Sequence, residues 1–183
     1  MSDADQLRRL LLERSVRRGD FVLASGQHSS YYIDCRLTTM SAEGMVLIGR
    51  MGLAAVRAAG WRPQAIGGLT MGADPVAYAV AAASFGSDLT IDAFSVRKEA
   101  KAYGTGRQIE GNFRAGAGVV VVEDVITTGG SAQKAISAVE TAGGRVLGVL
   151  AVVDREQGGR GALEAGGVAV VVLTTASELG LSN

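Results

Sequence analysis

The residues with the clearest chemical pattern run from Val119 to Ser131. Four consecutive valines predict a buried strand, and Glu123 and Asp124 follow at its carboxyl end. The loop after them consists of small residues, with two glycines and three hydroxyl side chains before the amino end of an expected helix. The glycines allow backbone N–H groups to turn inward, and the helix dipole adds positive charge. This loop, 127–131, is therefore predicted to be an anion cradle sized for a phosphate.

The two acids beside the cradle indicate a second part of the ligand. Adjacent carboxylates suit a vicinal diol, or a Mg²⁺ ion that is held partly through water. Together with the cradle they indicate a phosphorylated sugar. Two alternatives remain at this point: an ordinary strand end followed by a turn, and the metal-binding acids of a nucleotide hydrolase. The second requires a Gly-x-x-x-x-Gly-Lys-Ser/Thr loop, which the sequence lacks.

A basic segment begins at Arg97. Four basic residues and one acidic residue from Arg97 to Arg107 give it a local charge of +3, in a chain whose formal net charge is zero. A glycine-rich stretch continues to Gly111. Cations on a flexible loop suit a multiply charged anion that must bind and leave, such as pyrophosphate, and closure of the loop excludes water from a reactive sugar cation. A solvated basic hairpin is the alternative for this segment taken by itself.

Two further turns carry weaker signals. Gly67–Pro75 is a strand-to-helix turn with little side-chain bulk, so its backbone can approach an anion closely. Asp154–Gly159 follows another apolar strand and holds Arg155 between two acids. Such an arginine is ordinarily a surface ion-pair residue, and glycine-rich turns between strands and helices are common. Neither turn by itself indicates a ligand.

The pattern between these motifs predicts an α/β fold that brings them together. Apolar strands without polar alternation are separated by helices, which is typical of a mostly parallel sheet covered on both faces. Helices are expected over 3–18, 41–59, 75–85 and 131–142, strands over 65–69, 89–96, 118–122, 146–153 and 168–173, short extended pieces over 21–23 and 29–33, and a loop or ribbon over 97–117. Ligands of such sheets bind beyond the carboxyl ends of the strands. The loops at those ends are 69–74, 97–111, 123–131 and 154–160.

The composition is that of one soluble globular domain, with 183 residues of which 48% are apolar and 20% charged. Cys35 is the only cysteine, which excludes an intrachain disulfide and a cysteine-rich zinc module, and it is expected in the core. His28 is the only histidine and is expected on the surface. Equal numbers of basic and acidic residues argue against general nucleic-acid or membrane-surface binding. With no secretory signal and no apolar span of ~20 residues, the expected location is cytoplasmic.

Several of these motifs resemble those of a known protein family. The run from Val120 to Ala132 resembles the phosphoribosyl-pyrophosphate (PRPP) signature of the type I phosphoribosyltransferases, in the form typical of orotate phosphoribosyltransferases. Arg97–Lys101 resembles the catalytic loop of that family, and Gly67–Pro75 its pyrophosphate-binding loop. The resemblance implies the type I fold in a single domain over 1–183, with a small N-terminal hood (about 1–40) packed on the core and a flexible catalytic loop.

The activity that the resemblance implies is transfer of ribose 5-phosphate from PRPP to orotate, which yields orotidine 5′-monophosphate and pyrophosphate in de novo pyrimidine (UMP) biosynthesis. It also implies a Mg²⁺ cofactor held mainly through substrate and water, with no metal-ligand set of the protein's own. The loop reaches into the neighbouring subunit's site in that family, so a homodimer is implied, with neither a nucleic-acid nor a membrane partner.

The resemblance carries residue roles onto matching positions. To catalysis it assigns Lys101, Arg97, Lys98 and Asp124. To PRPP binding it assigns Arg97, Lys98, Lys101, Tyr103, Glu123, Asp124, Val125, Ile126, Thr127, Thr128, Gly129, Gly130, Ser131, Met71 and Gly72. To orotate binding it assigns Thr127, Arg155, Tyr32 and Ile33. For the last two, ordinary packing in a short strand is an equal alternative.

Three positions depart from the family pattern. Some members carry lysine where Ala24 and Gly72 stand, so possible contacts to substrate and pyrophosphate are missing. Some carry histidine where Tyr103 stands, and tyrosine can donate a hydrogen bond but cannot be a cation at neutral pH. Two other functions stay open: a phosphoribosyltransferase for a different base, and a non-catalytic PRPP sensor that binds nucleic acid. The zero net charge and the intact basic loop argue against the sensor.

Overall fold

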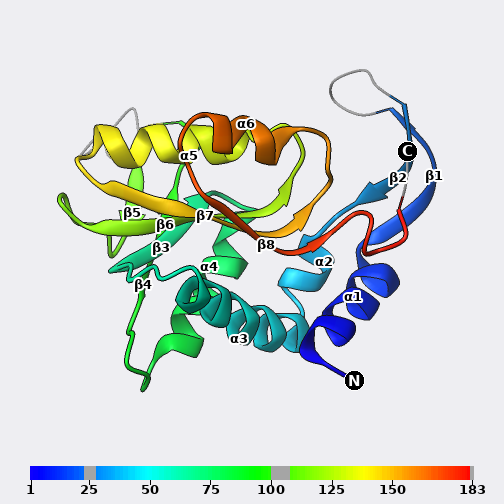
Figure 1. Cartoon of the computed structure of the whole chain (residues 1–183), viewed down its shortest axis with the longest axis horizontal. Coiled ribbons are helices and arrows are strands. Elements are labelled where there is room, and N and C mark those ends of the chain that lie inside the picture. The colour runs from blue at the N-terminus through cyan, green and yellow to red at the C-terminus, as the bar shows by residue number, and fades with distance from the viewer. Residues whose placement is uncertain (23–27, 100–107, 182–183) are drawn as a thin grey trace.

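The computed structural model describes residues 1–22, 28–99 and 108–181, and its centre is a six-stranded sheet. The strands are β3 (Ala65–Leu69), β4 (Asp92–Val96), β5 (Ile109–Gly111), β6 (Gly118–Ile126), β7 (Arg145–Asp154) and β8 (Val170–Thr175). Their order is β5-β4-β3-β6-β7-β8, with β5 antiparallel to β4 and every other neighbouring pair parallel (Figure 1). The carboxyl ends of the five parallel strands therefore meet at one edge.

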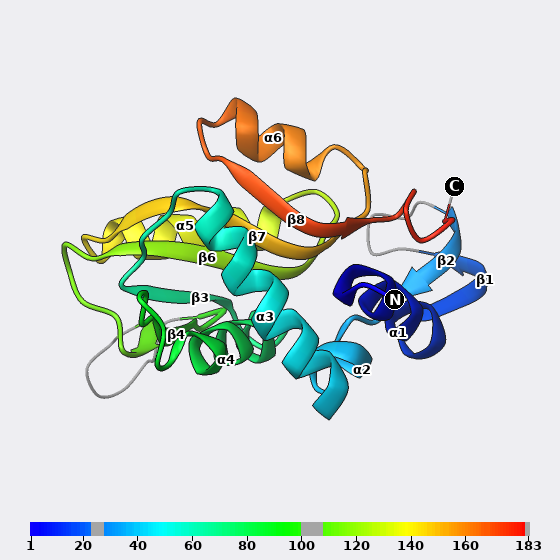
Figure 2. The same cartoon turned by 60° about the horizontal axis from the view of Figure 1, so that its bottom comes forward.

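Helices cover both faces of this sheet, as the apolar strands predict. The helices α3 (Ala42–Ala58) and α4 (Ala73–Ser84) pack on one face, and α5 (Gly130–Thr141) and α6 (Gly159–Ala165) lie over the other (Figures 1 and 2). In β6, Val120 and Val122 belong to the core beneath α3 and α4, whereas Val119 and Val121 belong to the core beneath α5. Successive strand residues point to opposite faces, so one run of valines builds both cores.

The N-terminal part stands beside the sheet rather than in it. It consists of α1 (Asp3–Arg14), an antiparallel ribbon of β1 (Val16–Val22) and β2 (His28–Ile33), and the short helix α2 (Arg36–Thr39). Leu7 and Leu11 of α1 join the core under α3, which fixes this unit to the domain. Figure 2 shows α1 and the ribbon together at one side of the molecule.

Several boundaries differ from the prediction for local reasons. The first helix stops at Arg14, not at residue 18, because Val16 begins the pairing with Ile33 of the ribbon. Conversely, β6 continues past Val122 to Ile126, since its last residues pair with β7, so the acid pair lies within the strand and not in the loop after it. The strand predicted from residue 89 begins at Asp92, and α2, β5 and α6 were not predicted.

Other predicted elements lie close to their observed bounds. Ser41 caps α3, accepting a hydrogen bond from Gly44 N–H at 3.1 Å, as expected for this residue before a helix. The helix predicted from Pro75 begins two residues earlier, at Ala73. Within the described parts of the chain, no helix combines the length and the apolar character that a membrane crossing requires.

Candidate active site

The predicted phosphate cradle is a hollow at the carboxyl end of β6. The turn Thr127–Ser131 lines it, together with Glu123 and the end of the strand, and encloses about 80 Å³. Gly129 adopts a φ of +80° and α5 begins directly after it. The backbone N–H groups of Thr127 and Thr128 donate no hydrogen bond to any residue that the structure describes. Unbonded N–H groups beside a helix amino end form a site for an anion.

A neighbouring glycine holds the cradle in shape. Gly159, the first residue of α6, donates its N–H to the carbonyl oxygen of Thr127 at 3.1 Å. A β-carbon at this position would lie 2.5 Å from that oxygen, so only glycine allows the approach. The start of α6, which the sequence did not predict, thus fixes the carbonyl of the cradle's first residue.

The pKa values of the two acids of β6, Glu123 and Asp124, are both raised above their usual values. Burial raises the pKa of Glu123 to about 8, and the charge of Asp124 adds to the effect, while the backbone N–H of Ala132 acts in the opposite direction. Burial also raises the pKa of Asp124, although the Val125 N–H, which donates to its Oδ1 at 3.0 Å, opposes this. Hydrogen bonds from hydroxyl groups, or a nearby cation, stabilise the ionised form of a desolvated carboxylate. Sugar hydroxyls and a metal ion are such partners.

The pyrophosphate-loop candidate packs directly against this acid pair. A β-carbon on Gly72 would lie 2.5 Å from Oδ1 of Asp124, so the turn touches the carboxylate, and a larger residue would require the Asp124 side chain to move. The bond between Thr70 and Met71 is cis, and the N–H groups of Met71 and Gly72 make no hydrogen bond with the described residues. Gly72 therefore leaves the Asp124 carboxylate in place beside this turn.

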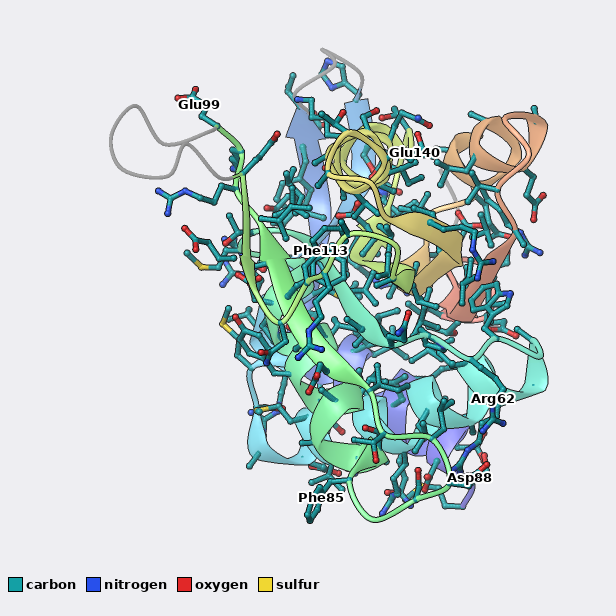
Figure 3. The ribbon with its side chains drawn as sticks, turned by 90° about the vertical axis from the view of Figure 1, so that its left-hand side faces the viewer. Arg62, Phe85, Asp88, Glu99, Phe113 and Glu140 are labelled. Atoms are coloured by element: carbon teal, nitrogen blue, oxygen red, sulfur yellow. The ribbon has the colours of Figure 1, made fainter. Side chains whose placement is uncertain are left out.

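The base of the cationic loop lies next to the same turn. Arg97 and Lys98 line an open depression of about 750 Å³ that Thr70 and Met71 also line. Arg97 pairs with Glu110 at 3.6 Å, and its backbone N–H donates to Gln108 O, which closes the base of the loop. Glu99, where the described part of this segment stops, projects away from the body of the protein (Figure 3). The candidates Lys101 and Tyr103, like Ala24, lie outside the described residues.

Arg155 is buried at the carboxyl end of β7, beneath the ribbon. Its Nη2 donates to Ser29 Oγ at 3.2 Å, and its Cζ lies 4.7 Å from the centre of the Tyr31 ring. Its backbone N–H donates to Ile126 O, so it lies beside Thr127. Its buried Nε has no partner among the described residues, so one donor of the guanidinium is left unsatisfied there.

The ribbon divides the predicted orotate residues between its two faces. Ser29, Tyr31 and Ile33 are buried, whereas Tyr32 is 40% exposed and packs on Phe21, with ring centres 5.8 Å apart. Tyr32 therefore points away from Arg155. The residues that do hold Arg155, Ser29 and Tyr31, were missed. Alternate residues of a strand point to the same face, so the spacing of Ser29, Tyr31 and Ile33 was the signal that could have predicted their shared position.

A second missed pair approaches the acids from the hood. Asp34 follows β2 and accepts hydrogen bonds from Arg36 Nε at 2.8 Å and Nη2 at 3.0 Å, through its two carboxylate oxygens. Both charges act on Asp124: the Arg36 guanidinium lowers the pKa of Asp124 and the Asp34 carboxylate raises it. The sequence did show an aspartate two residues before an arginine, just after a predicted strand. The predicted elements gave no reason to place this pair near Asp124.

The raised pKa of Glu123 predicts a pH dependence of stability. The ordinary pKa of this carboxyl is 4.5, and its pKa in the folded protein is about 8. Between these two pH values the carboxyl is protonated in the folded protein and ionised in the unfolded chain. The folded state then holds the extra proton, so this group makes the free energy of unfolding fall as the pH rises, by up to about 1.4 kcal/mol per pH unit. Glu123→Gln is expected to flatten this fall in urea unfolding experiments.

The control for this prediction is Glu140→Gln, an exposed residue on α5 (Figure 3). It is expected to leave the pH dependence unchanged. If Glu123→Gln and the unmodified chain lost stability equally over the same interval, Glu123 would not be the group that holds the proton.

Comparison with known proteins agrees with this geometry. Residues 45–163 match the phosphoribosyl transferase domain family. An orotate phosphoribosyltransferase of Aquifex aeolicus is 46% identical over 182 residues, which cover 98% of both chains. The chain belongs to the orotate phosphoribosyltransferases. The predicted family, the type I fold and the function class are thereby confirmed.

Solved structures of orotate phosphoribosyltransferases share the architecture. A crystal structure of the Mycobacterium tuberculosis orotate phosphoribosyltransferase in complex with Fe(III) dicitrate is 43% identical, with a TM-score of 0.87, and the match covers 98% of this chain and 100% of that one. A crystal structure of the same enzyme in complex with PRPP is 40% identical, with a TM-score of 0.83 and the same coverage. The fold described here is thus that of orotate phosphoribosyltransferases over almost its whole length.

Proposed function

We propose that this chain transfers ribose 5-phosphate from PRPP to orotate in a Mg²⁺-dependent reaction, which forms orotidine 5′-monophosphate and pyrophosphate for UMP synthesis. The observation that carries the proposal is the contact of Gly72 with Asp124. It joins a phosphate cradle at Thr127–Ser131 to a second set of N–H groups, those of Met71 and Gly72, which donate to none of the described residues. Two anion sites on either side of an acid pair match a sugar with phosphate groups at both ends.

In this proposal the reaction is displacement at the anomeric carbon. The cradle binds the 5′-phosphate, and Glu123 and Asp124 accept hydrogen bonds from the ribose hydroxyls. Arg97, Lys98 and Lys101 balance the charge that builds up on the departing pyrophosphate. Orotate arrives as an anion, so its N1 can attack without a general base. Orientation and electrostatic stabilisation then supply most of the rate.

The acids of β6 fit a Mg²⁺ ion that the substrate brings. Within the described ranges, no group of three or more Asp, Glu, His or Cys side chains could hold a metal by itself. Asp124 and Glu123 offer two carboxyl groups, whose ionised forms a bound cation would favour. Mg²⁺ usually keeps several waters and binds one or two carboxylates plus substrate phosphates. Asp124 and Glu123 are the residues that would hold the ion, and a bound ion would supply positive charge to the leaving pyrophosphate.

A homodimer that shares the catalytic loop completes the proposal. Apolar side chains lie exposed on α2, directly after it and at the start of α3, and the two helices contact each other; these side chains are Leu37, Met40, Met45 and Val46. Exposed apolar groups that gather over adjacent elements are typical of a subunit contact. We also place the enzyme in the cytoplasm, where subcellular fractionation would find it.

The direct test follows orotate consumption by ultraviolet absorbance. Turnover is expected only with PRPP, orotate and Mg²⁺ together, and omission of any one should abolish it. Turnover of another base in place of orotate would contradict the proposed substrate.

Arg155 tests the orotate site. Its fork of N–H donors suits a planar anion, and lysine cannot reproduce the fork, so Arg155→Lys is expected to raise the KM for orotate ~10-fold or more. The KM for PRPP should change by less than about twofold, because the Arg155 side chain is directed to Ser29 and Tyr31 of the ribbon and only its backbone lies next to the cradle. Steady-state kinetics with each substrate varied in turn would measure both.

Arg160→Lys, at an exposed position on α6 where Arg160 pairs with Glu164, is the matched control. It is expected to leave both constants unchanged. An equal rise of the two KM values in Arg155→Lys would show that Arg155 supports the ribbon and does not bind orotate.

A further inference from the structure

A carboxylate that the family resemblance did not single out joins two parts of the site. Asp74, in the first turn of α4, accepts a hydrogen bond from Thr70 Oγ1 on Oδ2 at 2.7 Å. It accepts another from Ser95 Oγ on Oδ1, also at 2.7 Å. The proton of Ser95 is thereby used, so the Tyr78 hydroxyl, 3.0 Å away, donates to Ser95 Oγ. The result is one connected network of three hydroxyls and an acid.

The two direct partners of Asp74 belong to the two segments that face the leaving group. Thr70 precedes Met71 and Gly72, whose N–H groups are unbonded among the described residues. Ser95 lies in β4 two residues before Arg97, and strand alternation places both on one face of the sheet. Thr70, Asp74, Ser95 and Arg97 all line the same depression. Asp74 therefore ties the turn to the base of the cationic loop.

An acid suits this task better than a neutral residue. Hydrogen bonds to a carboxylate are roughly twice as strong as those between neutral groups, and the amino end of α4 favours negative charge. An asparagine at this position has one acceptor oxygen in place of two, so its amide nitrogen, a donor, would face one of the two hydroxyls that now donate to Asp74. The negative charge itself opposes the binding of an anion in the depression. Its presence there is explained if the orientation that it imposes outweighs that repulsion.

We propose that Asp74 is a positioning residue for pyrophosphate binding. It fixes the Thr70 side chain, and through it the direction of the Met71 and Gly72 N–H groups, before the ligand arrives. Donors that are already oriented bind without the cost of ordering them. This inference rests on the proposed function, because it takes the depression as the pyrophosphate site.

The test compares two ligands that use different parts of the site. Asp74→Asn and Thr70→Val are each expected to weaken the binding of inorganic pyrophosphate about 10-fold, the usual effect of losing a hydrogen bond to a charged group. Binding of ribose 5-phosphate, which needs only the cradle, should change by less than about twofold. Thr70→Ser keeps the hydroxyl and should restore pyrophosphate binding. The double variant Asp74→Asn/Thr70→Val should be no weaker than either single one.

Thr174→Val is the matched control. Thr174 donates to Glu178, four residues later, at 2.8 Å, which repeats the Thr70–Asp74 spacing outside the depression. The Thr174→Val variant should lower the melting temperature as Thr70→Val does, but it should leave pyrophosphate binding unchanged. Equal weakening of both ligands in Asp74→Asn would overturn the positioning role in favour of a general structural one. Weakening seen only with Mg²⁺-pyrophosphate would overturn it in favour of metal binding.

The two proposals fail separately. If the unmodified chain bound neither pyrophosphate nor ribose 5-phosphate, and did not consume orotate, the proposed function would be wrong. If the unmodified chain bound both ligands and Asp74→Asn and Thr70→Val bound pyrophosphate normally, only the role of Asp74 would be wrong.

Discussion

Lys101→Ala is expected to reduce kcat at least ~100-fold, the scale that follows loss of a contact made to charge in the transition state. The basic loop carries a local charge of +3 in a neutral chain, and negative charge develops on pyrophosphate as its bond to the sugar breaks. A cation that meets this charge late in the reaction stabilises the transition state more than the bound substrate. The KM for PRPP should therefore change much less than kcat. Steady-state kinetics at saturating orotate would measure both constants.

Lys134→Ala serves as its control. Lys134 is an exposed lysine on α5, the helix that begins at the cradle, and its removal changes the net charge equally. It is expected to leave turnover unchanged. Undiminished turnover in Lys101→Ala would exclude the loop from the reaction, whereas a large rise in the KM for PRPP at constant kcat would assign Lys101 to ground-state binding.

The sequence was sufficient to predict the parts of the site that depend on local chemistry. Residues 127–131 could be identified as a cradle because a glycine turn before a helix exposes N–H groups wherever it occurs. The valines of β6 predicted a strand buried on both faces, and parallel strands bring their carboxyl ends together. The sheet and its two helical layers followed from the same pattern.

The remaining features depend on register and packing, which a single sequence does not display. The Asp74 network exists because β3 and β4 pair so that Ser95 lies opposite Gly68, close to the turn that follows β3. Burial of Arg155 depends on the ribbon that covers it, and the continuation of β6 to Ile126 depends on its pairing with β7. The roles assigned to the orotate and loop residues, and the division into a core with an N-terminal hood, stay predictions.

A loop shared between subunits predicts that two variants, each inactive by itself, regain activity when their subunits are combined in one dimer. Asp124→Asn removes a carboxylate that touches Gly72, and it should be as inactive as Lys101→Ala. If the loop enters the partner's site, a mixed dimer has one site with both substitutions and one with neither. Random reassociation of equal amounts should then recover about a quarter of the unmodified activity, because about half of the dimers are mixed and each has one intact site of two.

The outcome distinguishes the two arrangements of the loop because the alternative places one defect in every site. If the loop closed over its own subunit, one site of the mixed dimer would carry the Asp124→Asn substitution and the other would carry Lys101→Ala, so neither would work. Two different affinity tags allow the mixed dimer to be purified, and it should show about half of the unmodified activity per dimer. Remixing each variant with itself is the control and should recover nothing. A purified mixed dimer without activity would exclude the shared loop, even if the chain is a dimer, since recovery requires Lys101 of one subunit and Asp124 of the other to act on the same substrate.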